Sequence, residues 1–434
     1  MDTVTISIIC ISSLFVMMAI GVPVFISLGV SSVIGVILLQ GFDALSAIPG
    51  VMYDRMATFT LVAVPLFILM GEIIFASGLG SDLYRAIRIS LHRVRGSLAV
   101  ASVFACAIFG AMCGVSMAGA ATIGKFAIPE MIKAGYKTTI ATGVVASAGS
   151  LALLIPPSVG LILYGLVAGE SVGYLFIAGV IPGIIISLMM IVYILILGYL
   201  KPDLMPSISI AELEKEQDQG NPWVVTIPAL LLVFSVLGSI YLGIATPSES
   251  AAIGCFGAIL IAAYKRKLSW EVIKKIITDT TRTTGMILAI LASALVFGYL
   301  LTRLRIPQDL VNWIMDMGLS EYTVLIAIFL LLIVMGMFMD VVSVILIATP
   351  LLLPIIKAFN YDAIWFGIVM AIVTEMAVIT PPVGLNLFVI QGISPPGTSM
   401  MTVARGSFPF FLILVLAVVL FTIFPNLVLW LPFG

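Results

Sequence analysis

Two proline-centred stretches, LLIPPSVGLILY at 153–164 and VITPPVGLNLF at 378–388, decide how this chain is expected to fold. Each stretch places a Pro-Pro pair in the middle of an apolar segment. Proline has no backbone N–H and displaces the carbonyl one turn earlier, so a helix breaks or kinks there. Freed carbonyls in hydrocarbon are tolerated only where they face protein or a water-filled cavity. A single pair is compatible with a structural kink or an ion-binding break, and two such pairs favour the break.

The two stretches belong to an internal repeat with an offset of 225 residues. AIPEMIKAGY at 127–136 precedes the first stretch, and LLPIIKAFNY at 352–361 precedes the second. At this offset three prolines and one tyrosine of the first copy have counterparts in the second, including both members of the Pro-Pro pair. Matches of this kind at one offset indicate two related halves.

The remainder of the chain is apolar enough to make lipid its solvent. Of 434 residues, 62% are hydrophobic and 9% are charged, whereas soluble domains carry about 25% charged residues. Two regions, 97–133 and 321–357, are pairs of short apolar arms that we interpret as re-entrant hairpins. Other segments reach or approach the roughly 20 residues that span a bilayer: 4–22, 24–41, 57–79, 138–168, 172–200, 222–242, 248–264, 283–302, 362–392 and 404–430. The predicted fold is an all-α polytopic membrane protein.

The distribution of basic residues predicts how the chain is oriented. With the N-terminus outside, 16 of the 20 Lys and Arg residues fall on the cytoplasmic side, as the positive-inside rule requires. Both termini are then periplasmic. The first copy of the repeat begins outside and the second begins inside, so the copies are inverted. Inverted repeats with interrupted helices are typical of secondary transporters, whose sites lie at the repeat interface.

These observations divide the chain into five regions. Residues 1–56 and 222–282 are expected to form scaffold helices. Residues 57–200 form the first inverted repeat, with a hairpin and the break at 156–157, and residues 283–434 form the second, with a hairpin and the break at 381–382. Residues 201–221 form a polar cytoplasmic linker.

The turns of the two hairpins hold the first candidate site residues. The first turn, GAMCGVSMAGAAT at 110–122, is rich in small residues, which either pack helices closely or let ion-binding backbone approach. Its position opposite the first Pro-Pro pair favours binding. The second turn contains Asp340. An acid at the bilayer centre costs roughly 2.5–3.5 kcal/mol on insertion scales, so Asp340 either binds a cation or caps a helix.

Other polar residues at membrane depth receive simpler interpretations. Glu375 lies just before the second Pro-Pro pair, and its role as cation ligand or cap stays open. Glu249 follows a predicted turn in ATPSES and is interpreted as a helix cap, and Glu72 as a helix-contact residue. Lys125 is expected to extend to the cytoplasmic side.

Enzyme classes that depend on histidine or on a P-loop are excluded. His92 is the only histidine and lies in a basic cytoplasmic segment, so neither a histidine-based dyad nor an HExxH zinc site can form in the membrane. No Walker A sequence is present. We therefore expect no enzymatic activity, and transport energy must come from an ion gradient or a separate subunit.

Several motifs resemble the large membrane subunit of tripartite ATP-independent periplasmic (TRAP) transporters. They are the two Pro-Pro stretches, GVSMAGAATIGKFAIPEMIKAGY at 114–136, GMFMDVVSVILIATPLLLPI at 336–355 and ATPSESAA at 245–252. The resemblance covers essentially the whole chain. It implies an elevator mechanism in which the hairpins move against a scaffold at 4–41 and 222–264, with amphipathic arms near 80–96 and 303–320.

The resemblance also implies the cargo and the partners. Such a subunit imports an organic acid, such as sialic acid or a C4-dicarboxylate, together with Na⁺ across the bacterial inner membrane. It works with a small four-helix membrane subunit and a periplasmic substrate-binding protein. The alternative is a self-sufficient Na⁺- or H⁺-coupled carboxylate transporter that needs no binding protein.

Site residues carried over from the resemblance fall into three sets. One sodium site would use residues of the first hairpin tip and break: Gly114, Ser116, Ala152, Ile155 and Pro157. The other would use their counterparts in the second repeat: Gly336, Asp340, Ala377, Thr380 and Pro382. Substrate would contact Ser116, Gly384 and Asn386. Family members often have glycine where this chain has Ala152 and Ala377, a change that leaves backbone ligation possible.

Overall fold

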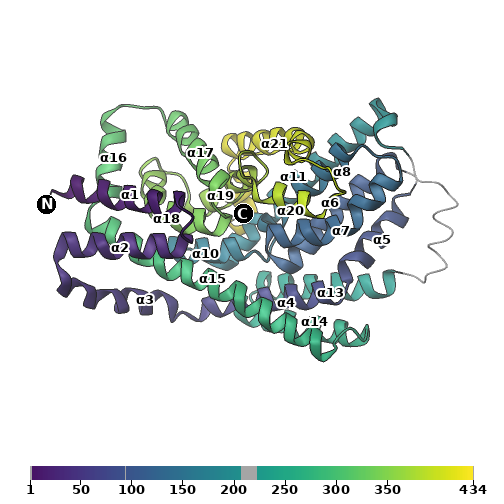
Figure 1. Ribbon diagram of the computed structural model, residues 1–434, viewed down its shortest axis with the longest axis horizontal. Helices are drawn as coiled ribbons and strands as arrows, with labels where there is room; N and C mark the ends of the chain where they lie inside the picture. Colours follow the sequence, from purple (N-terminus) through teal and green to yellow (C-terminus); the bar gives the residue numbers. More distant parts are fainter. Residues whose placement is uncertain (1, 93, 207–221, 434) are drawn as a thin grey trace.

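The computed structural model describes residues 2–92, 94–206 and 222–433, which form helices and no strand (Figure 1). Most of the predicted linker, 207–221, lies outside the described residues. Helices α1 and α2 lie toward one end of the long axis, and α5 lies toward the other. The N-terminal part consists of α1 (Thr3–Ala19), α2 (Val24–Gln40), the 3-10 helix η1 (Phe42–Ala47) and α3 (Ile48–Met56).

The first half of the repeat follows in the order that the sequence predicts. Its elements are η2 (Phe59–Val62), α4 (Ala63–Ala76), α5 (Leu79–Ser90), α6 (Ser97–Cys113), α7 (Ser116–Lys133), α8 (Thr138–Gly149), α9 (Leu151–Leu154), α10 (Val159–Ala168) and α11 (Val172–Leu200). The short helix η3 (Pro202–Leu204) comes next. The two central helices described after the linker are α13 (Trp223–Tyr241) and α14 (Pro247–Tyr264).

The second half contains the same succession of a long helix, an arm, a helix pair and a broken helix. Its elements are α15 (Trp270–Arg303), α16 (Ile306–Asp316), α17 (Glu321–Phe338), α18 (Val341–Ala358), α19 (Ala363–Val378), α20 (Leu385–Ile393), α21 (Met400–Ile423) and α22 (Asn426–Phe433). Helices α5 and α16 occupy the two predicted amphipathic arms. The inverted relation between the halves stays a prediction.

Helix α15 begins earlier than the sequence interpretation placed it. The apolar run at 283–302 suggested a helix there, but α15 starts at Trp270, where Ser269 caps it by accepting from the N–H of Val272 at 3.3 Å. The predicted boundary at 282 thus falls inside a continuous helix. Its first three turns mix apolar and charged residues and project beyond the apolar run, so a search for continuous hydrophobicity does not detect them. At 1.5 Å per residue the helix is about 50 Å long.

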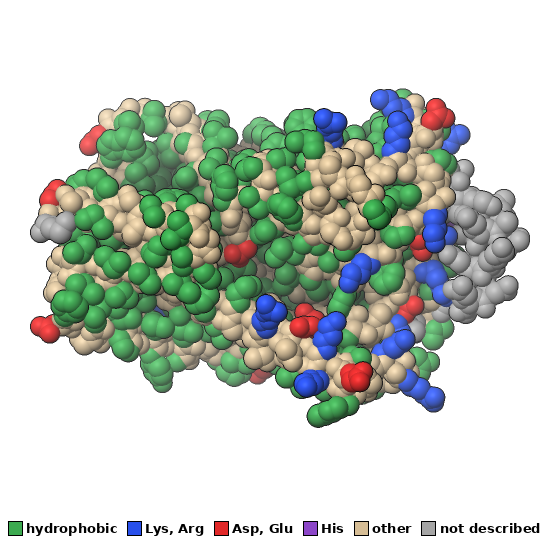
Figure 2. All heavy atoms as spheres, in the orientation of Figure 1, with side chains coloured by type: hydrophobic (Ala, Val, Ile, Leu, Met, Phe, Trp, Pro, Cys, Tyr) green, Lys and Arg blue, Asp and Glu red, His purple; other side chains and the backbone are tan. Residues whose placement is uncertain are grey.

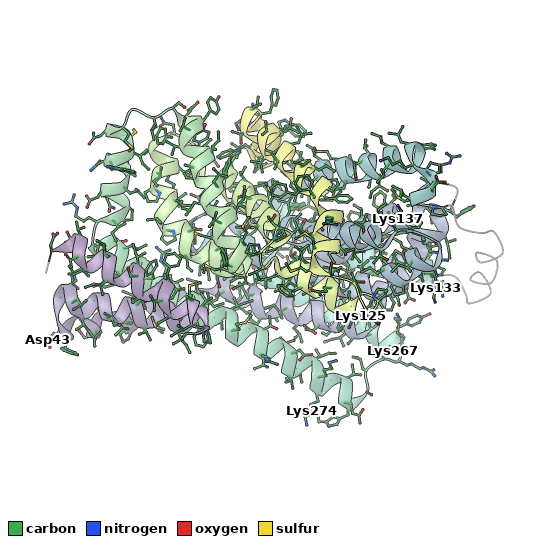
Figure 3. All side chains as sticks on the ribbon, turned by 45° about the horizontal axis from the view of Figure 1, so that its top comes forward. Asp43, Lys125, Lys133, Lys137, Lys267 and Lys274 are labelled. Carbon is green, nitrogen blue, oxygen red and sulfur yellow. The ribbon has the colours of Figure 1, made fainter. Side chains whose placement is uncertain are left out.

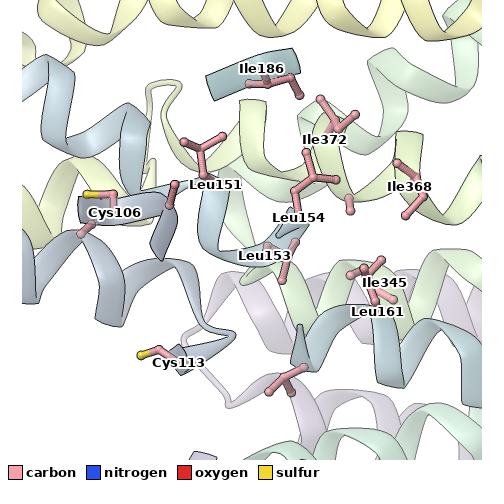
Figure 4. Close-up of a cluster of buried hydrophobic side chains, with 14 of the residues drawn as sticks. Cys106, Cys113, Leu151, Leu153, Leu154, Leu161, Ile186, Ile345, Ile368 and Ile372 are labelled. Atoms are coloured by element: carbon pink, nitrogen blue, oxygen red, sulfur yellow. The ribbon is translucent and has the colours of Figure 1, made fainter. Parts of the chain in front are cut away.

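The core lies where the two halves meet around α19. Every residue of α19 is buried, as expected of a helix that is apolar on all sides. Figure 4 shows side chains from α9, α10, α18 and α19 converging there. Helices α8 and α21 also approach closely, because a Cβ on Gly143 would lie 2.1 Å from the carbonyl carbon of Gly406. Small residues permit this backbone contact between membrane helices.

Helix pairs occupy both predicted hairpins. Helices α6 and α7 turn at Gly114 and Val115, and α17 and α18 turn at Met339 and Asp340. Both Pro-Pro pairs lie outside helix: the chain leaves α9 at Leu154 and enters α10 at Val159, and it leaves α19 at Val378 and enters α20 at Leu385. The peptide bond within each pair is cis. That the hairpin turns stop at mid-membrane stays a prediction.

The described helices are compatible with a multi-pass membrane protein. Seven of them are long and apolar enough to cross a bilayer, or eight if the bent run from α8 through α9 into α10 is one span. Figure 2 shows Lys and Arg gathered over one half of the molecule. In Figure 3 the lysines that the sequence assigns to the cytoplasm lie toward one end, and Asp43 lies at the other. This grouping agrees with the predicted sidedness.

Candidate functional site

A cavity of about 270 Å³ lies between the two hairpin tips and the two helix breaks. The first tip contributes residues 114–118, and the second contributes residues 340–342. Residues that flank each break line the same space, as do Thr283, Met286 and Ile287 of α15. The cavity therefore draws on both halves of the chain, as expected of a site at a repeat interface.

A hydrogen-bonded chain of three buried side chains crosses this interface. The Nδ2 of Asn386 donates to the Oγ of Ser116 at 3.0 Å, and the Oγ of Ser116 donates to the Oε2 of Glu375 at 2.9 Å. Asn386 also donates to the carbonyl of Ala146 at 3.3 Å. Ser116 belongs to the first hairpin, whereas Glu375 and Asn386 flank the second break. The sequence predicted Ser116 and Asn386 together, and the structure brings Glu375 to them.

The polar lining of the cavity is acidic. Asp340 and Glu375 both line it, and the described lining residues include no Lys, Arg or His. Glu375 is only 1% exposed. An isolated buried carboxylate is costly unless a cation or hydrogen-bond donors offset its charge. The described lining therefore offers acidic side chains and no basic one.

The first tip and the first break touch through their backbones. The N–H of Val159 donates to the carbonyl of Gly114 at 3.3 Å. Gly114 is left-handed, with φ +64°, and a Cβ there would lie 2.9 Å from the carbonyl oxygen of Pro157. A Cβ on Gly110 would lie 2.5 Å from the Cα of Ala152. The predicted residues Gly114, Ala152 and Pro157 are thus in one backbone cluster.

The side chains of two members of the first predicted sodium set, Ile155 and Ser116, have contacts outside the first break. The side chain of Ile155 packs toward α11, where its Cγ1 would lie 2.7 Å from a Cβ on Gly183. The hydroxyl of Ser116 is engaged with Glu375 and Asn386 of the second repeat. Ligation at the first break would therefore depend on backbone carbonyls, as the sequence interpretation expects.

The second set is arranged differently. A Cβ on Gly336 would lie 2.6 Å from the Cβ of Ala377, so these two predicted residues are neighbours. A Cβ on Gly384 would lie 2.9 Å from the carbonyl oxygen of Thr380. The hydroxyl of Thr380 donates back to the carbonyl of Met376 at 2.7 Å. Pro382 is exposed.

Asp340 caps helix α18. Its Oδ2 accepts from the N–H of Ser343 at 3.0 Å, and its Oδ1 accepts from the hydroxyl of Ser343 at 2.5 Å. Of the two interpretations left open by the sequence, the cap is present in the structure. A cap does not prevent the same carboxylate from binding a cation, because each carboxylate oxygen accepts more than one contact.

The comparisons with known proteins agree with this architecture. Residues 11–427 match the family model described as "Tripartite ATP-independent periplasmic transporter, DctM component". The chain belongs to this family. It is 36% identical to the C4-dicarboxylate TRAP transporter large permease protein DctM of Vibrio cholerae, over 96% of this chain and 95% of that protein. It is 34% identical to the protein of the same name from Pseudomonas aeruginosa, over 94% and 93%.

A solved structure shares the fold at lower sequence identity. The YdaH transporter of Alcanivorax borkumensis superimposes with a TM-score of 0.63 and 14% identity, covering 91% of this chain and 90% of that one. At this identity the likeness concerns the fold alone.

A second cavity of about 300 Å³ adjoins the first in this TRAP permease. The two share Val115, Ala118 and Thr283 in their linings. The second cavity contains charges of both signs, contributed by Glu72, Lys125, Lys275 and Asp279. Glu72 therefore does more than make the helix contact that we predicted, and the Nζ of Lys125 lies 5.5 Å from the ring centroid of Phe75.

Sequence interpretation missed the part that α15 plays in both cavities. Lys275 and Asp279 are four residues apart and so lie on one face of a helix, and Thr283 and Met286 continue along it. Once the helix is known to begin at Trp270, this spacing identifies the face. Glu249 was interpreted correctly: it forms a capping box with Thr246 at the start of α14.

Proposed function

We propose that this TRAP permease couples Na⁺ entry to import of an organic acid across the bacterial inner membrane. The observation that carries the proposal is the cavity between the two hairpin tips and the two helix breaks. Interrupted helices offer carbonyl oxygens for Na⁺ and helix N-termini for a substrate carboxylate. The two sodium sets and the substrate set named above are the proposed ligands.

The cargo is proposed to be a small organic acid, with a C4-dicarboxylate as the first candidate. The two relatives described above bear the name of C4-dicarboxylate transporters. Sialic acid is the second candidate that the sequence interpretation named. The cavity volume of about 270 Å³ suits a small solute.

The substrate is proposed to reach the permease from a periplasmic binding protein, with a small four-helix subunit as the membrane partner. Membership of a tripartite family supports this over the self-sufficient transporter that we considered as an alternative. With the predicted sidedness, both termini are periplasmic and the linker is cytoplasmic.

We further propose that the hairpins move as an elevator against the scaffold. Helix α5 is suited to the role of an arm, because it contacts both sides. Its Arg88 forms an ion pair with Glu130 of the first hairpin, and its Asp82 forms an ion pair with Lys265 at the end of α14. The second contact joins the arm to the proposed scaffold.

The decisive experiment is uptake into proteoliposomes that contain this chain and its small subunit. Radiolabelled succinate or sialic acid is supplied with and without the matching binding protein, under an inward Na⁺ gradient or an equal choline gradient. Uptake that needs both the Na⁺ gradient and the binding protein is the expected result. Uptake by the permease without a binding protein would favour the self-sufficient alternative, and uptake without Na⁺ would remove sodium coupling.

A further inference from the structure

The side-chain chain of Asn386, Ser116 and Glu375 leaves two buried oxygen atoms without a partner. They are the Oε1 of Glu375 and the Oδ1 of Asn386, and each exposes less than 1 Å². Buried polar atoms in proteins are normally hydrogen-bonded, and an exception needs a physical explanation. Both atoms belong to residues that line the cavity, so a bound species can reach this cluster.

The direction of the hydrogen bonds shows what kind of species the two oxygen atoms can bind. Asn386 donates to the carbonyl of Ala146, and a carbonyl can only accept, which fixes the amide with Nδ2 on that side. Ser116 has one proton, and it is used on Glu375. The unpartnered atoms are both acceptors. A cation or a hydrogen-bond donor satisfies them, whereas an anion does not.

The charge around the cluster points to a cation. Glu375 is a buried carboxylate, and the described cavity lining offers it no Lys, Arg or His. The basic residues Lys125 and Lys275 line the adjoining cavity instead. Carboxylate, amide and hydroxyl oxygens are ligands that hard metal cations prefer. An organic acid entering the cavity would also meet the charges of Asp340 and Glu375 unless cations offset them.

We propose that Glu375, Asn386 and Ser116 bind a sodium ion that bridges the two repeats. This site shares Ser116 with the first sodium set and with the substrate set inferred from family resemblance, and it shares Asn386 with the substrate set. It differs from these sets because its charge comes from Glu375. Ser116 holds the first hairpin against it. The proposal rests on the proposed function in taking Na⁺ as the coupling cation. Sodium bound here attaches the first hairpin tip to the second break and neutralises the cavity before the acid enters.

The test measures sodium binding without substrate or transport. The full chain with its small subunit is placed in nanodiscs, and ²²Na⁺ binding is measured to saturation at constant ionic strength with choline chloride. Glu375→Gln is compared with wild type and with Glu249→Gln, a matched control at an exposed capping box that glutamine preserves. We expect Glu375→Gln to bind one Na⁺ fewer per chain, and Glu249→Gln to bind as many as wild type.

A second pair of variants keeps the test valid if Glu375→Gln does not fold. Glu375→Asp retains the charge but shortens the side chain, and Asn386→Ala removes the second acceptor. Each should weaken Na⁺ binding about ten-fold while the protein stays monodisperse. The proposal would be overturned if Glu375→Gln, or both of the other variants, bound as many Na⁺ ions per chain as wild type and with the same affinity. Such a result leaves Na⁺-driven uptake by wild type intact, whereas the absence of that uptake removes the proposed function itself.

Discussion

Each half of the chain contains a unit made of a helical hairpin and a Pro-Pro break. The first unit is α6–α7 with the break at 156–157, and the second is α17–α18 with the break at 381–382. The two units hold the hairpin tip in place by different contacts. In the first unit the tip is a left-handed glycine, Gly114, that touches the Pro157 carbonyl, and the break at 156–157 is buried. In the second unit the tip is capped by the side chain of Asp340, and the break at 381–382 is partly exposed, with Pro382 open. The first unit is closed by backbone packing and the second by a side-chain cap.

This difference shows how two segments with the same order of helices can differ in the amino-acid substitutions that they tolerate. Backbone contacts at the first unit allow almost no added atom, because the obstructing groups cannot move aside. At Gly336 in the second unit the obstructing group is the methyl of Ala377, which a compensating substitution can remove. We therefore expect changes in the first unit to affect folding and transport together, and changes in the second to affect transport more selectively.

Replacement of the Pro-Pro pairs should have the largest effect. Ala-Ala at 156–157 or at 381–382 permits continuous helix and withdraws the carbonyls that the breaks expose. We expect both variants to abolish Na⁺-dependent uptake in proteoliposomes. Only the first should also lower the melting temperature, because Pro156 packs in a buried break against α11, 3.5 Å from a Cβ on Gly179. Normal sodium-dependent uptake in either variant would disprove the broken-helix interpretation for that unit.

Alanine substitutions at Gly114 and Gly336 test whether the atoms that obstruct an added Cβ belong to the backbone or to a side chain. Gly114→Ala places a Cβ 2.9 Å from a carbonyl oxygen in a left-handed conformation, which costs roughly 1–2 kcal/mol for the conformation alone. Gly336→Ala places a Cβ 2.6 Å from the Cβ of Ala377. Both variants should lose uptake and thermal stability.

The control for this pair is a compensating change. In the double variant Gly336→Ala, Ala377→Gly the obstructing methyl is removed, so uptake and melting temperature should recover. Gly114→Ala has no such partner, because its obstruction is main chain. If the double variant stays as impaired as Gly336→Ala, the side-chain account of the second unit is wrong.

Removal of the Ser116 hydroxyl should weaken the contact between the two units. Ser116→Ala leaves the Oε2 of Glu375 and one Asn386 N–H without their partner, and an unsatisfied buried polar group costs about 1–3 kcal/mol. We expect the Na⁺ concentration for half-maximal uptake to rise. Ser343→Ala in the second unit removes only a contact to the Asp340 cap. This variant should raise the Na⁺ concentration for half-maximal uptake by less than Ser116→Ala does. An unchanged sodium curve in Ser116→Ala would exclude Ser116 from the site.

The sequence predicted the helix breaks and the extent of the hairpins because both depend on local chemistry. Proline forbids helix wherever it disrupts the hydrogen-bond ladder, and the arms at 97–133 and 321–357 coincide with α6–α7 and α17–α18 to within one residue. Ser116 and Asn386 were named from the family resemblance, and the structure brings their side chains into contact, while their part in substrate binding stays a prediction. Features fixed by local residue type are thus accessible without coordinates.

The contacts between distant residues were not accessible in the same way. Glu375 was recognised only as an acid near a break, because nothing local indicates that Ser116, 259 residues away, donates to it. The start of α15 was missed because its first turns mix apolar with charged residues and so interrupt the apolar run. The contribution of Lys275 and Asp279 to the adjoining cavity was missed with it. Both features arise from tertiary packing, which periodicity does not encode.

The smallest effects are expected from variants of Asp340, which separate its role as a helix cap from its proposed role in binding Na⁺. Asn caps helices about as well as Asp, whereas Ala loses about 1 kcal/mol of unfolding free energy at such a position. Asp340→Ala should therefore lower the melting temperature slightly, and Asp340→Asn should not. Both variants remove the negative charge, so both should raise the Na⁺ concentration for half-maximal uptake if Asp340 belongs to the second sodium site. A wild-type sodium curve in Asp340→Asn would limit Asp340 to capping, and the second unit would then be expected to bind Na⁺ through backbone oxygens, as we propose for the first unit.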